Sequence, residues 1–84
     1  MGAQDDNETS KSKGFENLTV SELMLAIHET ILSKEDKRIA ELRFVDLETI
    51  ERIAEIMYMD KRTVRKRLLK IFPRIAWTVD KLLR

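Results

Sequence analysis

The stretch LETIERIAEIMYMDKRTVRKRLLKIF, residues 47–72, decides the fold. Apolar residues recur along both of its parts at steps of three and four, which predicts two amphipathic helices that each bury one stripe. The stripes consist of Leu47, Ile50, Ile53, Ala54 and Met57 in the first helix and of Val64, Leu68, Ile71 and Phe72 in the second. Between them lie only Tyr58, Met59 and Asp60, and the Asp60 carboxylate can cap the second helix by accepting its free N–H groups. A helix, a short turn and a crossing helix predict a helix-turn-helix.

The second helix of this motif is strongly basic. Its cations are Lys61, Arg62, Arg65, Lys66, Arg67 and Lys70, and it has no acid. Residues 1–60 hold 7 basic and 14 acidic side chains, whereas residues 61–84 hold 9 and 1, so the two parts carry −7 and +8 charges. A run of lysine and arginine usually marks a solvated helix face, but such a face normally interleaves acids that pair with the cations. The pattern therefore favours contact with the phosphates of duplex DNA.

A family resemblance becomes visible in and before this motif. The residues that carry it are Ile53-Ala54-Glu55, Asp60, Thr63-Val64-x-x-Arg67-Leu68 and the upstream Ile39-Ala40-Glu41-Leu42-Arg43-Phe44. Together they resemble region four of bacterial primary sigma factors and small phage regulators of the ArpU and RinA type, over residues 30–72. The resemblance implies that Ala54 lies where the two helices touch, that Val64 is a buried anchor and that Thr63 contacts a phosphate. It also implies a phage or mobile-element transcription regulator, with RNA polymerase as a possible partner.

Two positions depart from the pattern of these families. They usually have glycine in the turn between the helices, where this chain has Tyr58, a residue that is strained at positive φ. The entry to the first motif helix also differs, which leaves two N-caps open. Asp46 is the cap that the spacing favours, and Thr49 is the cap that the resemblance implies.

The rest of the chain predicts one small all-α domain. Residues 1–17 are polar and aperiodic, which predicts a disordered tail before a helix-turn-helix domain over residues 18–84. No apolar run approaches the length of a membrane span, and the absence of cysteine suits a reducing cytoplasm. We therefore expect a cytoplasmic protein without a membrane partner.

Two helices are expected before the motif. Thr19 and Glu22 predict a capping box for a helix that runs to about Leu32, and Ser33 predicts the cap of a second helix over about residues 34–44. The predicted core positions of these helices are Val20, Leu23, Met24, Ile27 and Ile31 in the first and Ile39, Ala40 and Leu42 in the second. The domain is thus expected to have four to five short helices.

Pro73 is expected to break the basic helix, because proline pushes the preceding Phe72 away from helical dihedrals. A separate helix would then run to Leu83; a kinked continuation of the basic helix is the alternative. This segment either folds back onto the core or forms a two-fold dimer seam, which we prefer because single motifs bind DNA weakly. The predicted seam residues are Ile75, Val79, Leu82 and Leu83. Trp77 is either a core residue or an interface anchor.

Roles within the basic helix follow from docking of its N-terminal part in the major groove. The candidates for base edges are Lys61, Arg62, Arg65 and Lys66, and those for phosphates are Thr63, Lys70 and Arg74. Leu69 either touches a thymine methyl group or packs against the C-terminal helix. Arg67 either reaches a phosphate or pairs with Glu55 across the motif.

Catalytic and metal chemistry find little support in this sequence. His28 is the only histidine and precedes Glu29 as in helical zinc proteases, but Leu32 stands where the second histidine would be. Both glycines, Gly2 and Gly14, lie in the tail, so no phosphate-cradling loop is possible. We expect no metal, no cofactor and no enzymatic activity.

The basic helix therefore predicts a protein that binds double-stranded DNA in a sequence-specific way. One alternative is a protein-interaction module that binds RNA polymerase or another protein. A DNA-packaging recognition subunit is a further alternative, because it would use a similar motif.

Overall fold

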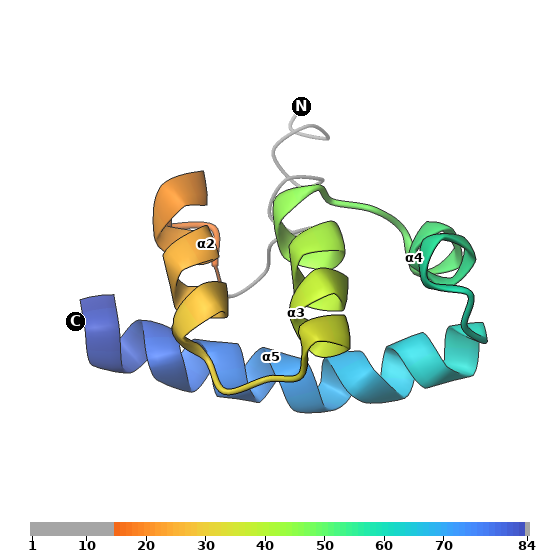
Figure 1. Ribbon diagram of the computed structural model, residues 1–84. Helices are drawn as coiled ribbons and strands as arrows, with labels where there is room; N and C mark the ends of the chain where they lie inside the picture. The colour runs from red at the N-terminus through yellow and green to blue at the C-terminus, as the bar shows by residue number, and fades with distance from the viewer. Residues whose placement is uncertain (1–14, 84) are drawn as a thin grey trace.

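The computed structural model describes residues 15–83, except for the side chain of Leu83, and this part of the chain is all-α (Figure 1). Its elements are α2 (Val20–Glu29), α3 (Lys34–Ala40), the π-helical turn η1 (Glu41–Val45), α4 (Ile50–Met57) and α5 (Lys61–Leu83). None of the helices within residues 15–83 combines the length and the apolar content that a membrane-spanning segment needs.

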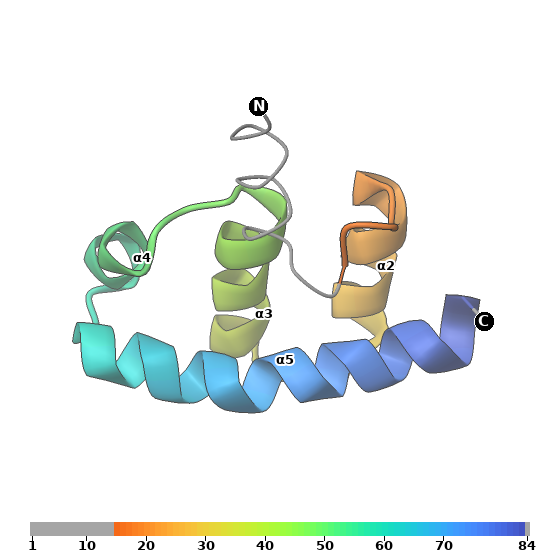
Figure 2. The same cartoon turned by 180° about the vertical axis from the view of Figure 1, so that it is seen from behind.

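The helix α5 is a long rod on which the other helices lie. Both views show α2 and α3 side by side and upright on this rod, with α4 across its N-terminal end (Figures 1 and 2). The side of α5 that points away from these helices is left uncovered by them. The architecture thus exposes one face of the helix along its length.

A single core lies between α5 and the shorter helices. Its fully buried side chains include Ile27, Ile39, Ile53, Val64, Ile71 and Ile75, so every α-helix contributes. Phe15 joins this core, with its ring centroid 5.3 Å from that of Phe44 and 4.9 Å from that of Phe72. The predicted tail of residues 1–17 is therefore wrong at its end, because burial of the Phe15 ring adds residues 15–17 to the domain. Residues 1–14 lie outside the described part of the chain.

The predicted caps of the first two helices are confirmed. The Glu22 N–H donates to Thr19 Oγ1 (3.1 Å) while the Thr19 N–H donates to Glu22 Oε1 (2.9 Å), and Ser33 Oγ accepts from the Asp36 N–H (3.1 Å). The helix α2 ends at Glu29 and not at Leu32. Three residues predicted for the core are instead exposed, and they are Val20, Met24 and Ile31. Val20 is the first residue of α2, Met24 lies in the middle of this helix, and Ile31 lies beyond its end.

The start of α4 follows the cap that the family resemblance implied. Thr49 Oγ1 accepts from the Arg52 N–H (3.1 Å), so the prediction of Asp46 as the N-cap is wrong. The preceding helix ends in η1, after which Leu47 takes a positive φ of 60°. Leu47 is thus outside α4 and partly exposed, and its assignment to the buried stripe is also wrong.

Pro73 lies inside α5 and does not end it. The predicted break and the separate helix after Pro73 are therefore wrong, and the basic helix continues to Leu83. Proline lacks the N–H that would bond to the carbonyl of Leu69, which disfavours a helix at this point. However, Ile71 and Ile75 on either side of it are both buried in the same core. Ending the helix at Pro73 would remove one of them from the core, so packing holds the rod together.

Candidate nucleic-acid interface

The turn before α5 is built without the glycine that such turns favour. Tyr58 takes a left-handed conformation (φ 56°, ψ 47°), with its side chain 95% exposed. Its N–H donates to the Glu55 carbonyl (3.3 Å), and the Met59 N–H donates to the Ala54 carbonyl (2.9 Å). These two bonds form a Schellman motif, which ends α4 and redirects the chain into α5. The Tyr58 backbone is therefore strained for the sake of the turn.

The start of α5 is fixed by Asp60 and by the packing of α4 against it. Asp60 Oδ1 accepts from the Arg62 N–H (2.7 Å), and the Asp60 carbonyl accepts from the Val64 N–H (3.1 Å). The carboxylate also stabilises the positive end of the helix dipole. Ala54 and Val64 are buried where α4 and α5 meet. The Asp60 cap and this packing together fix the direction of the side chains that follow in α5.

An outward basic face follows from the helical period. The exposed residues of this half of α5 are Lys61, Arg62, Arg65, Lys66, Leu69 and Lys70. Within residues 15–83, no carboxylate forms an ion pair with any of the five cations. Leu69 is 77% exposed on the same face, and packing against a separate C-terminal helix is wrong because α5 is continuous. The face can therefore present positive charge and one apolar contact to a polyanion.

Arg67 is the cation that does not belong to this face. Its Nη1 lies 3.1 Å from Glu35 Oε1 and 3.0 Å from Asp36 Oδ1, at the start of α3. The hydrogen bond to Asp36 raises the pKa of Arg67 above its ordinary value, and the negative charges of both acids add to this while burial opposes it. The predicted pair with Glu55 is wrong, because Glu55 pairs with Arg52 on its own helix (3.0 Å). These two partly exposed ion pairs link α5 to α3, and they neutralise the charge of Arg67 with acids of the protein itself.

The predicted phosphate contacts follow one flank of α5, next to the start of α3. Thr63 is partly buried, whereas Lys70 and Arg74 are exposed. Lys70 and Arg74 line a small hollow together with Asp36, and Arg74 Nη1 donates to the Ile31 carbonyl (3.3 Å). These three residues therefore border the outward face, which is where groups that contact the sugar-phosphate backbone of DNA are expected.

The structure brings together only part of the predicted dimer seam. Ile75 is fully buried and Val79 packs against the core, so both are wrong as seam residues: they complete the core under α2. Leu82 is exposed, and the side chain of Leu83 lies outside the described part. Trp77 is 64% exposed, which excludes the core position that the sequence left open.

One feature of the site had no local signal in the sequence. The acids that hold Arg67 are more than thirty positions away in the chain, and nothing in the spacing connects them.

Within residues 15–83, no group of three or more histidine, cysteine or acidic side chains could hold a metal ion. Comparison of the chain with protein-family models, curated proteins and solved structures finds no significant match.

Proposed function

We propose that this protein acts in the cytoplasm and binds double-stranded DNA in a sequence-specific way, as a transcription regulator of phage or mobile-element type. The observation that carries the proposal is the outward face of α5, where five exposed cations have no acidic partner within residues 15–83. Surface cations of a protein without a polyanionic ligand usually alternate with acids. The adjoining turn and α4 complete a helix-turn-helix, whose second helix docks in the major groove.

The proposed roles divide the face by position. Arg62, Arg65 and Lys66 point away from the core and contact base edges, with arginine suited to the two acceptors of guanine. Leu69 is placed on the same side to touch a thymine methyl group. Thr63 and Lys70 on the flank contact phosphates and set the register of the protein on the duplex. The Arg74 guanidinium is instead directed to the Ile31 carbonyl in the connection after α2, and we do not assign it a phosphate. Lys61, beside the Asp60 cap, adds positive charge at the start of the helix.

The test compares two variants that lose the same charge. Arg62→Gln, Arg65→Gln and Lys66→Gln together remove three cations from the outward face. The control removes three exposed cations elsewhere, through Lys34→Gln, Arg38→Gln and Arg52→Gln. A mobility-shift titration should show selection of particular duplexes by the wild type and the control, with affinity falling steeply as salt rises, by about 0.9 log units per log unit of salt for each phosphate contacted. Loss of binding only in the first variant supports the proposal, and equal binding by both variants contradicts it.

A second candidate function is favoured by a hollow of about 470 Å³ beside this face. Phe44 and Phe72 form part of its lining, and Arg43 and Arg65 give it positive charge. An acidic segment of a protein partner, such as a polymerase subunit, would fit this chemistry. Competition separates the two functions: generic duplex at low salt should displace a partner that shares the DNA-binding face, whereas a dedicated adaptor should ignore it.

A further inference from the structure

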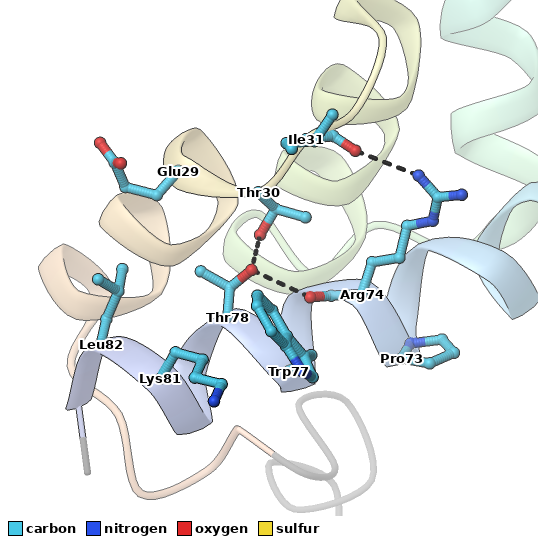
Figure 3. Close-up of a pocket in the computed structure, with 9 residues that line it drawn as sticks. All are labelled: Glu29, Thr30, Ile31, Pro73, Arg74, Trp77, Thr78, Lys81 and Leu82. Carbon is cyan, nitrogen blue, oxygen red and sulfur yellow. Dashed lines mark hydrogen bonds between the residues drawn. The ribbon is translucent and has the colours of Figure 1, made fainter.

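A second surface lies at the other end of α5, where the helix passes the end of α2. A groove of about 520 Å³ runs there, with Trp77 and Lys81 from α5 on one wall (Figure 3). Ile31, in the connection after α2, is 87% exposed beside it, and Leu82 is 47% exposed at its end. A patch of solvent-exposed apolar side chains is typical of an interaction site. Trp77 is the residue type that most often anchors such a site.

The walls of this groove are held in place before any partner arrives. The Thr30 and Thr78 hydroxyl groups form a buried hydrogen bond of 2.8 Å between the end of α2 and α5. The Thr78 hydroxyl also lies 3.1 Å from the Arg74 carbonyl oxygen, and the Arg74 guanidinium donates to the Ile31 carbonyl (Figure 3). The groove is therefore a preformed surface, so that binding requires little ordering of its side chains.

Opposite charges lie at the two ends of the groove. Glu29 lies at the Leu82 end and Arg74 at the Pro73 end, with Trp77 between them, and both charged groups are on the side of α2 (Figure 3). A third charge, Lys81, lies between the two ends with its Nζ 5.3 Å from the centroid of the Trp77 ring. Neither Glu29 nor Arg74 takes part in an ion pair within residues 15–83. A two-fold axis near Trp77 exchanges the two ends. Glu29 of one chain then faces Arg74 of the other, twice, while the two indoles meet near the axis.

We propose that this groove is a two-fold interface that binds a second copy of the chain. The charge pattern complements itself under that symmetry, which is what an interface between identical patches requires. A wholly acidic partner would leave Glu29 opposite a like charge, and a wholly basic partner would leave Arg74 and Lys81 opposite like charges, whereas a second copy pairs Glu29 with Arg74 at both ends.

The length of α5 agrees with this arrangement, in an argument that rests on the proposed DNA binding. Twelve positions separate Lys66, within the basic face, from Thr78, beside the axis. At about 1.5 Å per residue they span about 18 Å, so that two antiparallel copies place their basic faces about 36 Å apart along the direction of α5. Successive major grooves on one side of B-DNA are about 34–36 Å apart. A dimer through the groove would therefore present both basic faces to one side of a duplex.

Sedimentation equilibrium of the full chain without DNA tests the interface directly. The wild type should be a reversible dimer, and Trp77→Ala should raise the dissociation constant of the dimer by about a hundredfold, because each dimer loses two anchors. Met24→Ala removes an exposed apolar side chain of α2 outside the groove and should leave the constant unchanged. A monomeric wild type, or a dimer indifferent to Trp77→Ala, would overturn the proposal.

Mixing two charge variants tests the symmetry. Glu29→Arg and Arg74→Glu each place two like-charge pairs in their own homodimer, which should weaken it by about tenfold. A mixture of the two chains, one of them fluorescently labelled, should form a heterodimer in preference to either homodimer, since both pairs are then opposite in sign. Equal association of all combinations would contradict the pairing.

Selection of bound duplexes from a random pool keeps this proposal apart from the proposed function. Inverted half-sites about one helical turn apart, centre to centre, support the two-fold arrangement on DNA. Single half-sites bound by a dimeric protein would overturn that arrangement. If no sequence is enriched, DNA binding fails, and the sedimentation results alone decide whether the interface exists.

Discussion

The two halves of α5 belong to one helix but expose different chemistry. Within residues 15–83, no acid pairs with the five exposed cations of residues 61–70, which dominate the outward face of that half. Residues 71–83 instead expose the apolar Pro73, Trp77 and Leu82 among charges of both signs, Arg74, Asp80 and Lys81. Both halves bury the same kind of stripe, which includes Val64 in the first half and Ile75 in the second. The difference shows that a continuous buried stripe holds α5 in place along its whole length. The exposed residues of the two halves are not constrained by this packing and can differ in chemistry.

The largest expected effect tests whether the two halves share one core. Ile75→Ala should lower the free energy of unfolding by about 2–5 kcal/mol, because the side chain is fully buried and leaves a cavity. Urea unfolding followed by far-UV circular dichroism and by Trp77 fluorescence should give coincident transitions. Leu69→Ala, on the exposed face, is the control and should change stability by less than about 0.5 kcal/mol. Two separate transitions in Ile75→Ala would show that the C-terminal half unfolds independently.

The next effect separates cations within the basic half. Arg65→Ala should cost about 1–3 kcal/mol of DNA-binding free energy, concentrated at one base position. Arg67→Ala removes the same charge from the same helix, but its guanidinium is already paired with Glu35 and Asp36. Its effect on binding should therefore be smaller, and Lys70→Ala should weaken all duplex sequences alike. Mobility-shift titrations on a set of single-base variants measure all three. An equal loss in Arg65→Ala and Arg67→Ala would contradict the division between free and paired cations.

Pro73 marks the boundary between the halves, and its replacement should strengthen the rod. Pro73→Ala restores the backbone N–H that can donate to the Leu69 carbonyl, so we expect a gain of about 1–2 kcal/mol in the free energy of unfolding. Thermal unfolding followed by circular dichroism measures this gain. Ala76→Pro, in the same half of the helix, is the reverse control and should destabilise the protein. Unchanged or lower stability in Pro73→Ala would mean that the fold requires the proline.

The smallest effect concerns the turn that leads into the basic half. Tyr58→Gly should stabilise the protein by about 0.5–1 kcal/mol, because glycine takes the left-handed conformation without strain. Glu55→Gly, at an exposed helical position of α4, is the matched control and should lose about 1 kcal/mol. Urea titration measures both changes. A loss of stability in Tyr58→Gly would show that the exposed tyrosine ring contributes more than its backbone costs.

Local patterns in the sequence predict those features of the fold that depend on neighbouring residues. The Thr19–Glu22 capping box and the Asp60 cap involve residues close in the chain, so spacing was enough to find them. The outward basic face also followed from the helical period alone. The path of the chain at Pro73 did not, since it depends on packing of Ile71 and Ile75 against helices from elsewhere in the sequence.

The remaining errors have the same physical origin. The polar segment around Phe15 predicts a tail, and only the contacts of Phe15 with Phe44 and Phe72 reveal its place in the core. Ile31 and Met24 follow a helical period but lie where no other helix covers them. Periodicity shows which side of a helix is apolar, whereas the extent of burial depends on how far the neighbouring element reaches.

The salt bridges of Arg67 bear on how α5 is rotated about its own axis. Successive residues of an α-helix are about 100° apart around its axis, so a restraint on one flank determines the direction of every other side chain. The carboxylate of Asp36, bound to Arg67, supplies that restraint from another helix. A neutral residue at position 36 would leave Arg67 with Glu35 alone and weaken this link between α3 and α5, while the buried stripe would still hold the helix. An acid that lies outside the basic face thus adds to the restraint that keeps the cations of that face in position.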